Sequence, residues 1–295
     1  MKTFFLILGG ILSFFFFFSC SPLLSRDWEL VLSLRDVPKA EGDEIYAGDH
    51  FVNFLSESSA VAINYLNQFY LTKDAGRSWF KSVIPTNLRC QQPEPIDLNN
   101  VLVGTPQGAV NFTVDAGKTW QRIEDSFGLM AINMLGHEQG LFYNWSRLFL
   151  YDARTQSLNE VTLPGNLGKG LSCAALALEG KIFVLGQNGR FFMKDRASQT
   201  WQELKLPVKD INDFSFDYQV ASLRFTMKGE GLLLSFNKKE EAWAIFHTKG
   251  SGKDFSYITL LKGYFGRSAI APDGQFITIM PKQADEKILV LKRKN

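Results

Sequence analysis

LTKDAGRSWF (residues 71–80) and NFTVDAGKTW (residues 111–120) are two copies of one short pattern. Aligned on Asp74 and Asp115, they share Thr-x-Asp-Ala-Gly-x-(Ser/Thr)-Trp and lie about 40 residues apart. A repeat of this period is typical of chains in which one supersecondary unit is stacked several times. The pattern therefore predicts a repeat architecture.

Three degenerate copies continue the series. LYDARTQSLNEV keeps Asp152 but has no Trp, and FMKDRASQTWQEL contains Asp195 and Trp201 without the Gly. FHTKGSGKDFSYI keeps Thr248 and Gly252 but has Gly at the position of the Asp. Because these copies follow at a similar spacing, we expect the same unit to extend through most of the chain.

Each unit reads as four short apolar runs separated by turns. In the fourth unit these runs are LSCAALAL, KIFVLG, RFFMKD and WQELKLP. The composition favours strands and turns, with 26 Phe, 8 Tyr and 24 Gly, and no sustained helical periodicity follows the N-terminus. Four-stranded units of this length are typical of propeller blades, so we predict an all-β fold consisting of a single β-propeller.

The two ends of the chain predict how the ring closes. The last unit contains RSAIAP, QFITIMP and KILVLKRK and then lacks a fourth strand, whereas RDWELVLSL (26–34) precedes the first unit and resembles WQELKLP. An N-terminal strand that completes the final blade would remove the exposed edges of an open array. The prediction is a propeller domain over 28–295 with about six blades, or seven if the long fifth unit contains an additional one.

The repeated pattern resembles the Asp-box, or bacterial neuraminidase repeat, which implies a turn between the third and fourth strands of a blade. In such a turn the Asp accepts hydrogen bonds from backbone N–H groups two residues on, and Gly adopts positive φ. The Trp begins the next strand, where its ring can fill the wedge between neighbouring sheets. The residues assigned to these structural turns are Asp74, Gly76, Trp79, Asp115, Gly117, Trp120, Asp195 and Trp201.

The N-terminus predicts export. Lys2 precedes the 15 residues FFLILGGILSFFFFF, which are too few to span a bilayer as a helix, where about 20 are needed. Ser19-Cys20 resembles the lipobox of bacterial lipoproteins, although Phe17 stands where that family usually has Leu. The resemblance implies a signal peptide over 1–19, a lipid on Cys20 and a tether over 20–27; Ser21 resembles an outer-membrane sorting signal.

Charge and cysteine content exclude several classes of function. The chain has 32 Lys and Arg against 30 Asp and Glu, and it loses Lys2 with the signal, so we expect no nucleic-acid-binding surface. Cys90 and Cys173 permit at most one disulfide, and they are expected to be small buried residues. The scattered Cys and His residues form no metal-binding pattern, and we expect no cofactor.

The Asp-box resemblance leaves the function open between two classes. Propellers with this motif include sialidases, sortilin-type receptors, some glucanases and the photosystem II assembly factor family, and the box lies away from the usual active site. A sialidase would need an arginine triad and a Tyr nucleophile, for which the chain offers Arg89, Arg224, Arg267 and Tyr264. The Arg-Ile-Pro phrase that precedes the first box in sialidases is absent. We therefore favour a non-catalytic protein-binding or assembly module of the cell envelope, with a sialidase-like glycoside hydrolase or a glycan-binding propeller as the alternative.

The expected binding face carries the longest loops, 35–49, 85–95 and 207–219. The last of these is aromatic and acidic, which suits a protein partner, but Phe214 and Phe216 alternate with polar residues and could equally form an additional strand. Shorter turns add Trp and Arg side chains that could accept an anionic ligand or a glycan. The candidate binding residues are Arg89, Trp145, Arg147, Arg190, Phe216, Tyr218, Tyr264 and Arg267.

Overall fold

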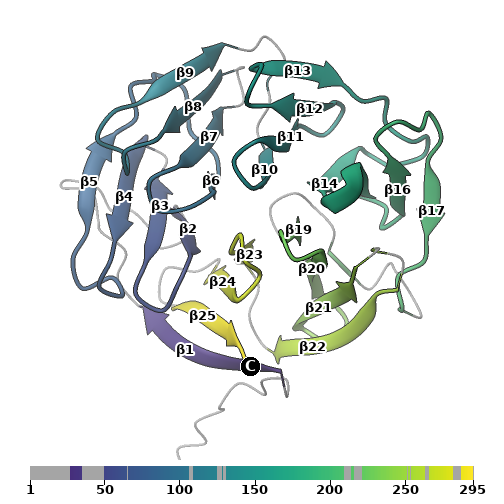
Figure 1. Cartoon of the computed structure of the whole chain (residues 1–295). Helices are drawn as coiled ribbons and strands as arrows, with labels where there is room; N and C mark the ends of the chain where they lie inside the picture. The colour runs from purple at the N-terminus through teal and green to yellow at the C-terminus, as the bar shows by residue number, and fades with distance from the viewer. Residues whose placement is uncertain are drawn as a thin grey trace, which may run out of the picture.

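The computed structural model describes residues 27–34, 50–64, 66–105, 109–124, 128, 131–208, 214–215, 221–250, 252, 254–262, 266–281 and 287–294. They form six antiparallel sheets arranged around a central axis (Figure 1). This confirms the predicted all-β propeller, in which the described residues form six blades. The helical element of this described part is a 3₁₀ turn at Leu178–Gly180, and within the same part no helix is long and apolar enough to cross a membrane.

The first three blades are built from consecutive strands, which follow one another from the axis outward. Blade 1 contains β2 (His50–Phe54), β3 (Ala60–Asn64), β4 (Gln68–Thr72) and β5 (Phe80–Val83). Blade 2 contains β6 (Pro93–Pro95), β7 (Val101–Thr105), β8 (Ala109–Thr113) and β9 (Gln121–Glu124). Blade 3 contains β10 (Ala131–Leu135), β11 (Gln139–Tyr143), β12 (Leu148–Asp152) and β13 (Ser157–Glu160).

Blades 4 and 5 continue the order, and blade 6 uses both ends of the chain. Blade 4 contains β14 (Leu171–Leu176), β15 (Lys181–Gly186), β16 (Phe191–Asp195) and β17 (Gln202–Leu204). Blade 5 contains β18 (Phe214–Ser215) and β19 (Ser222–Phe225), then β20 (Glu230–Asn237), β21 (Ala242–Lys249) and β22 (Ser256–Lys262). Blade 6 contains β23 (Gly266–Ile270), β24 (Phe276–Pro281), β25 (Ile288–Arg293) and β1 (Trp28–Leu34).

Blade 5 is longer because its inner strand is divided. Both β18 and β19 pair with β20, β18 opposite Phe236 and Asn237 and β19 opposite the stretch 231–234. The additional length of the fifth unit therefore lies in an interrupted inner strand and not in another blade. Phe214 belongs to the short strand β18, whereas Phe216 lies outside the described residues.

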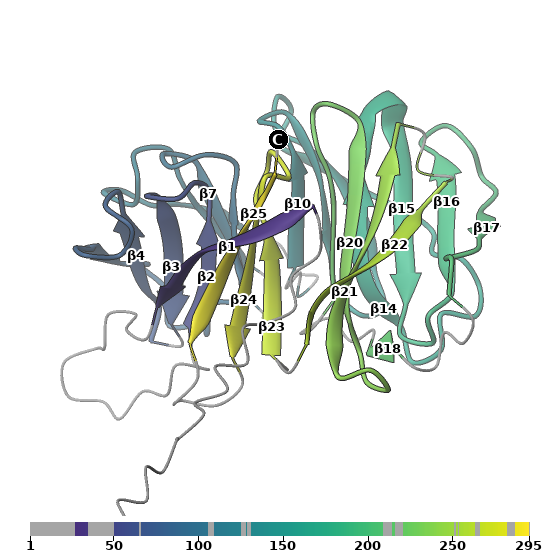
Figure 2. The same cartoon turned by 90° about the horizontal axis from the view of Figure 1, so that it is seen from below.

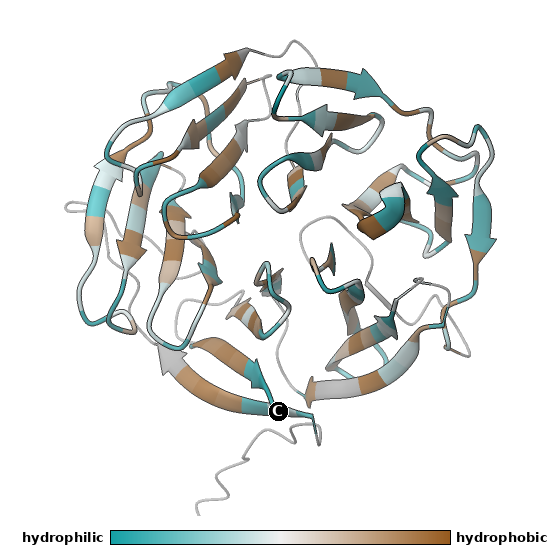
Figure 3. Ribbon diagram, in the orientation of Figure 1, coloured by the Kyte–Doolittle hydropathy of each residue, from teal (hydrophilic) through white to brown (hydrophobic). Residues whose placement is uncertain are grey.

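The core consists of the interfaces between blades. Six clusters of buried apolar residues occur in the described part of the chain, one between each pair of neighbouring blades. In β3, Ala60 and Ala62 pack toward blade 6, while Val61 and Ile63 pack toward blade 2. Because successive side chains point to opposite faces of a strand and both faces are covered, this strand is apolar at successive positions and does not alternate. Figure 3 shows the contrast with the outer strand β17, which is mainly hydrophilic.

The N-terminal strand closes the ring, as predicted. β1 is the outer strand of blade 6 and runs antiparallel to β25, from the pair Trp28–Arg293 to the pair Leu34–Ile288. The backbone N–H of Lys294 also donates to the carbonyl of Asp27 at 2.9 Å. Trp28 is buried in the cluster between blades 5 and 6, so this strand contributes to the core as well as to the sheet.

The molecule has two distinct faces (Figure 2). We use "turn face" for the side that carries the connections from first to second and from third to fourth strands of each blade. We use "loop face" for the side with the connections from second to third strands and from one blade to the next. β25 ends and β1 begins on the turn face, which is the upper side of Figure 2, where the C-terminus is marked.

Candidate functional site

The first repeated motif forms a hydrogen-bonded turn between β4 and β5. The Asp74 carboxylate accepts from the Ser78 backbone N–H at 2.9 Å, from the Ser78 hydroxyl at 2.6 Å and from the Thr72 hydroxyl at 2.8 Å. Thr72 Oγ1 in turn accepts from the Gly76 N–H at 2.9 Å. The hydroxyl and N–H of Ser78 and the hydroxyl of Thr72 lower the pKa of Asp74 from 3.8 to about 2.

The second motif repeats this turn between β8 and β9. Asp115 accepts from the N–H and hydroxyl of Thr119 at 2.9 and 2.6 Å, and Thr113 Oγ1 accepts from the Gly117 N–H at 2.8 Å. The same bonds lower the pKa of Asp115 to about 2, the Thr119 hydroxyl contributing most. Gly117 has φ of 81°, and a Cβ there would lie 2.5 Å from Phe69 of blade 1.

The bonding differs in detail from the expected scheme. Each Asp binds the residue four positions on, and it is the Thr two positions before the Asp that binds the Gly N–H. The degenerate copy at Asp195 is held differently, because the Ser198 N–H donates to the Asp195 backbone carbonyl at 2.9 Å and the Ser198 hydroxyl contacts Thr200.

The tryptophans of the motif lie between blades. Trp120 packs edge-on against Phe69 of blade 1 with ring centroids 5.2 Å apart. Trp201 of blade 4 donates its indole N–H to the carbonyl of Thr162, at 2.8 Å, at the interface with blade 3. Trp79 contacts the cluster between blades 6 and 1. These residues secure the scaffold, so a binding site has to be sought elsewhere on the molecule.

A chamber of about 200 Å³ lies on the axis and is open toward the loop face. Its wall is formed by the inner strands of all six blades and by the connection that leads into β6. A site that receives side chains from every blade is held by the rigid ring as a whole. The polar and charged residues of this wall include Asn53, Arg89, Glu94, Asn133, Ser172, Arg224 and Arg267.

Three polar side chains in the chamber wall have unpaired atoms. Asn53 of β2, Asn133 of β10 and Ser172 of β14 are each at most 5% exposed. The Asn133 amide N–H donates to the Leu223 carbonyl at 2.9 Å, which leaves its Oδ1 without a partner. Asn53 Oδ1 and Ser172 Oγ are also unpaired. These three atoms are themselves buried within the wall.

A buried ion pair forms the floor of the chamber. Glu94 of β6 pairs with Arg224 of β19, and Glu94 Oε1 accepts from the Met134 N–H at 2.8 Å. Burial raises the pKa of the Glu94 carboxyl above its ordinary value, while the charge of Arg224 and the Met134 N–H act in the opposite direction. Arg224 also lines a second cavity of about 280 Å³ that includes Met227 on the turn face. The pair therefore separates two cavities along the axis.

The mouth of the chamber is positively charged. Arg89 and Arg267 line it, and the Arg267 guanidinium lies 4.3 Å from the centre of the Phe51 ring. With Arg224 and Glu94, the described wall contains three formal positive charges and one negative charge. Tyr143 also lines the wall, and burial raises the pKa of its hydroxyl, which is therefore protonated at neutral pH.

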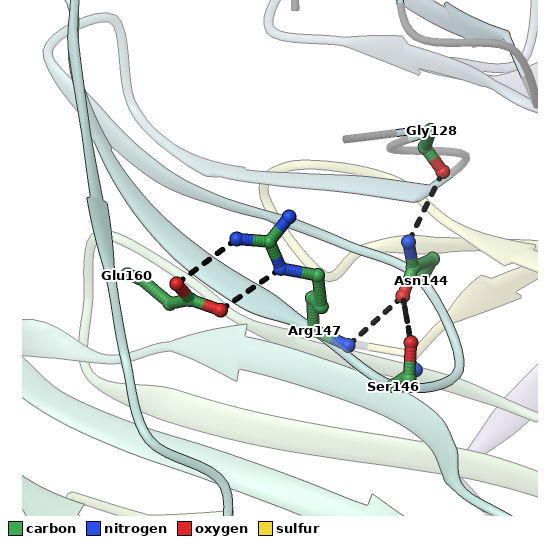
Figure 4. A network of polar contacts seen from close by, with 5 residues as sticks. All are labelled: Gly128, Asn144, Ser146, Arg147 and Glu160. Carbon is green, nitrogen blue, oxygen red and sulfur yellow. Dashed lines mark hydrogen bonds and ion pairs between the residues drawn. The ribbon is translucent and has the colours of Figure 1, made fainter. Parts of the chain in front are cut away.

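Arg147 and Arg190 lie away from the chamber. Arg147 makes two contacts of 2.9 Å with Glu160 of β13, and Asn144 holds the turn that carries it (Figure 4). Arg190 pairs in the same way with Glu203 of β17. Both arginines thus tie outer strands to their blades at the loop face. Trp145, in the same turn as Arg147, has an exposed fraction of 60%.

Other predicted residues lie outside the described part of the chain, namely Cys20, Phe216, Tyr218 and Tyr264. Cys90 and Cys173 are buried free thiols, and burial raises the pKa of Cys90 to about 12. No group of described His, Cys, Asp and Glu residues could hold a metal ion.

Sequence reasoning did not single out Asn53, Glu94, Asn133 and Ser172. Their signal was present, since each is a polar residue in a short, otherwise largely apolar inner strand. Burial of a polar side chain at such a position costs free energy unless its polar atoms form hydrogen bonds.

Comparisons with solved structures support the propeller fold. "YCF48 bound to D1 peptide" is 12% identical with a TM-score of 0.57 and covers 92% of this chain and 98% of that chain. YCF48 from Cyanidioschyzon merolae is 11% identical, with a TM-score of 0.51, and the match covers 90% of this chain and 98% of that chain. Virginiamycin B lyase from Staphylococcus aureus is 11% identical, with a TM-score of 0.59, and the match covers 90% of this chain and 99% of that chain. These likenesses show the fold alone.

The sequence comparisons give no family. No protein-family model matches the chain, and no curated protein matches it.

Proposed function

We propose that this chain is a non-catalytic, lipid-anchored propeller of the bacterial cell envelope that binds a protein partner through its loop face. The observation that carries the proposal is the opening of the axial chamber on that face, together with three exposed apolar side chains there in blades 1 and 3. Leu66, Val83 and Trp145 have exposed fractions of 50%, 62% and 60%. Aromatic side chains such as that of Trp145 are enriched at protein-binding surfaces. Exposed apolar residues occur on the turn face as well, namely Phe80, Val114 and Met227.

The comparisons add support of a general kind. One of the similar structures is YCF48 bound to a D1 peptide, which is a propeller with a peptide ligand. Another is a lyase, so the fold is compatible with catalysis as well. The protein-binding proposal therefore depends on the surface of this chain and not on its fold.

The membrane anchor is part of the proposal and depends on the N-terminal sequence. Lys2, the Phe-rich apolar segment and Ser19-Cys20 support export and acylation at Cys20, and Ser21 supports the outer membrane as the destination. Cys20→Ala should leave an unprocessed chain without diacylglyceryl-cysteine, as read by mass spectrometry of the N-terminus. Processing at another residue in the native chain would contradict the anchor.

The glycan-binding or sialidase-like alternative is favoured by one observation, which is that Arg89, Arg224 and Arg267 all line the chamber. The sialidase-like, catalytic version of this alternative has little further support. Arg224 is already paired with Glu94, and none of the described residues that line the chamber is an aspartate that could serve as acid. Turnover of a fluorogenic sialoside that disappears in Arg267→Gln would favour the enzyme.

The binding face can be tested with a matched pair of valines. Val83 lies on the loop face and Val114 on the turn face, with exposed fractions of 62% and 56%. A photo-crosslinking residue at position 83 should capture a protein partner in native membranes, and the same residue at position 114 should not. Equal capture at both positions, or capture at 114 alone, would contradict the loop face as the binding surface.

A further inference from the structure

We propose that the turn face of blades 1 and 2 contacts the surface of a bilayer that contains anionic phospholipids, with Phe80 and Val114 in the interfacial region and Lys73 and Lys118 against the headgroups. The proposal goes beyond the lipid anchor, because it assigns a membrane contact to the folded ring itself. It depends on three observations on the described residues, which are an amphipathic groove, a set of unpaired cations and the place where the chain enters the ring.

A groove of about 310 Å³ lies on the turn face between blades 1 and 2 and receives residues from both intact motif turns. Leu71 and Phe80, which stand opposite each other in the pair of β4 and β5, and Ala116 of blade 2 form its apolar part. Its polar part consists of Lys73, Ser78 and Lys118. An apolar surface bordered by lysines suits the boundary between the headgroups and the acyl chains of a bilayer.

Two large apolar side chains are exposed at these turns. Phe80, the first residue of β5, has an exposed fraction of 43%, and Val114, which precedes Asp115, has one of 56%. In blade 2 the position of Phe80 is occupied by Gln121, so the motif itself does not require an aromatic residue there. Phe beside basic residues is typical of surfaces that enter the interfacial region of a membrane.

The variable positions of the repeated motif carry the positive charge. In Thr-x-Asp-Ala-Gly-x-(Ser/Thr)-Trp these positions are Lys73 and Arg77 in blade 1 and Val114 and Lys118 in blade 2. The three cations are exposed, and in the described part of the chain their side chains form no ion pair. The carboxylates of the two motifs are occupied by hydroxyl and N–H donors of their own turns. Three cations and two carboxylates leave a formal charge of +1, which favours an anionic surface.

The chain enters the ring on the same face, next to the same blades. β1 begins on the turn face in blade 6, which is the neighbour of blade 1 in the ring (Figure 1). Lys292 of blade 6 and Glu57 of blade 1 form an ion pair of 2.7 Å on this face. An acylated N-terminus would therefore hold blades 1 and 2 beside the membrane and raise the effective concentration of lipid at the groove.

Quenching by nitroxide-labelled lipids tests the contact in the mature, purified chain with vesicles. A fluorescent amino acid replaces either Val114 on the turn face or Val83 on the loop face, two valines of similar exposure. We expect strong quenching at position 114 in phosphatidylcholine mixed with phosphatidylglycerol, and weak quenching there in phosphatidylcholine alone. We expect no quenching at position 83. High salt should weaken the quenching at position 114, because it screens exposed charges.

Variants separate the charged and the apolar part of the contact. Lys73→Gln with Lys118→Gln should lower the ratio of membrane-bound to free rings about 25-fold, because each lysine near an anionic surface contributes about fivefold. Lys169→Gln with Lys205→Gln is the matched control, because it removes the same charge from exposed positions of the loop face. Phe80→Gln introduces the residue that blade 2 has at this position, and it should shift quenching from acyl-chain to headgroup nitroxides. Thermal unfolding verifies that each variant is folded.

Three results would overturn the proposal. One is the lack of quenching at position 114 in both kinds of vesicle, and another is quenching at position 83 in place of 114. The third is quenching at position 114 that is equal in both kinds of vesicle and unchanged in the double lysine variant. Crosslinking of position 114 to a protein, without quenching by lipid, would assign this face to a protein partner or a second copy of the chain and would also overturn the proposal.

The membrane contact and the lipid anchor fail separately. Mass spectrometry of the same preparation reads the acyl group on Cys20. A chain without this group that is still quenched at position 114 would support the contact of the ring and contradict the anchor. An acylated chain that is not quenched there would support the anchor and contradict the contact. Capture of a protein partner at position 83 is independent of both results.

Discussion

Blades 1 and 2 differ from blades 3 and 4 in how the outer strand is attached. An outer strand pairs along one edge only, and β5, β13 and β17 are largely exposed or half-buried. In blades 1 and 2 the motif turns around Asp74 and Asp115 hold this strand at the turn face. In blades 3 and 4 the pairs Arg147–Glu160 and Arg190–Glu203 hold it at the loop face.

The second arrangement is itself a repeat. Phe149 and Phe192 stand opposite Glu160 and Glu203 in the strand register, and each arginine lies two residues before its Phe. The Arg147 guanidinium lies 4.8 Å from the centre of the Phe149 ring, and in blade 4 the corresponding distance is 5.1 Å. The spacing Arg-x-Phe followed by Glu is thus shared by two neighbouring blades.

The two kinds of blade differ in the end at which a polar contact joins the third and fourth strands. Where the repeated motif is intact, the turn holds the third and fourth strands together through a fully hydrogen-bonded carboxylate. In blades 3 and 4 a bidentate arginine pair joins the same two strands at the loop face. Blade 5, whose copy is also degenerate, contains no arginine between residues 230 and 262. Blade 6 is a third case, because its outer strand β1 has no turn that connects it to β25.

The largest expected effect comes from removing the strand that has no connecting turn. A chain that starts at Leu34 loses Trp28, which is 2% exposed, and leaves β25 as an open edge. Truncation of a buried Trp side chain alone costs about 3–5 kcal/mol, so we expect loss of the cooperative unfolding transition by calorimetry. A chain that starts at Ser25 is the control and should unfold as the full chain does. Identical unfolding of both chains would show that blade 6 needs no outer strand.

The buried and exposed arginine pairs should differ sharply. Arg224→Met leaves Glu94 buried without a counter-charge, which should cost about 3–5 kcal/mol in denaturant unfolding. The double variant with Glu94→Leu should recover most of this loss, because an apolar pair can replace a buried ion pair. Arg190→Met breaks an exposed pair and should change stability little. Equal losses of stability from Arg224→Met and Arg190→Met would mean that burial does not decide how much these ion pairs contribute.

A glycine substitution compares an intact turn with a degenerate one. Gly117→Ala combines a positive φ with a Cβ 2.5 Å from Phe69, and we expect a loss of about 2–4 kcal/mol. Gly250→Ala has a similar φ of 84° but no atom within 4 Å of the new Cβ, so about 1 kcal/mol is expected. Denaturant midpoints measure both. A loss in Gly250→Ala as large as that in Gly117→Ala would attribute the effect to φ alone.

Acid should weaken the intact turns specifically. The folded pKa of Asp115 is about 2 against an ordinary 3.8, so the folded state binds fewer protons than the unfolded chain between these values. The stabilisation by the carboxylate is complete above about pH 4 and is lost as the pH falls toward 2. Asp115→Asn should lower the melting temperature at neutral pH and flatten its decline in acid. A decline in acid as steep in Asp115→Asn as in the native chain would contradict a role for the ionised carboxylate.

The fold was predictable because its signals are periodic. The motif at Asp74 and Asp115 recurs with the blade, and the similarity of RDWELVLSL to WQELKLP identified the closing strand. The interrupted inner strand of blade 5 could not be predicted, because a long unit allows either an additional blade or a divided strand. Register and pairing with β20 decided between them.

The candidate site was only partly predictable, because it is assembled from residues far apart in sequence. Arg89 and Arg267 were selected as loop-face cations, and both line the chamber. Arg147 and Arg190 were selected on the same grounds, yet each lies beside a glutamate on the next strand, and a sequence pattern without strand register does not show that neighbour. Asn133 meets Leu223 only because six blades converge on one axis.

With the proposed lipid on Cys20, the direction in which β1 runs would decide which face of the propeller lies toward the membrane. The chain enters the ring on the turn face, at Trp28, and SPLLSRD is all that separates this residue from Cys20. With the proposed lipid on Cys20, seven extended residues keep that face within about 25 Å of the bilayer surface. The turn face of the propeller then lies toward the lipid, and the loop face, with the opening of the chamber, lies toward the aqueous compartment. A partner that binds the loop face would then approach from the aqueous compartment.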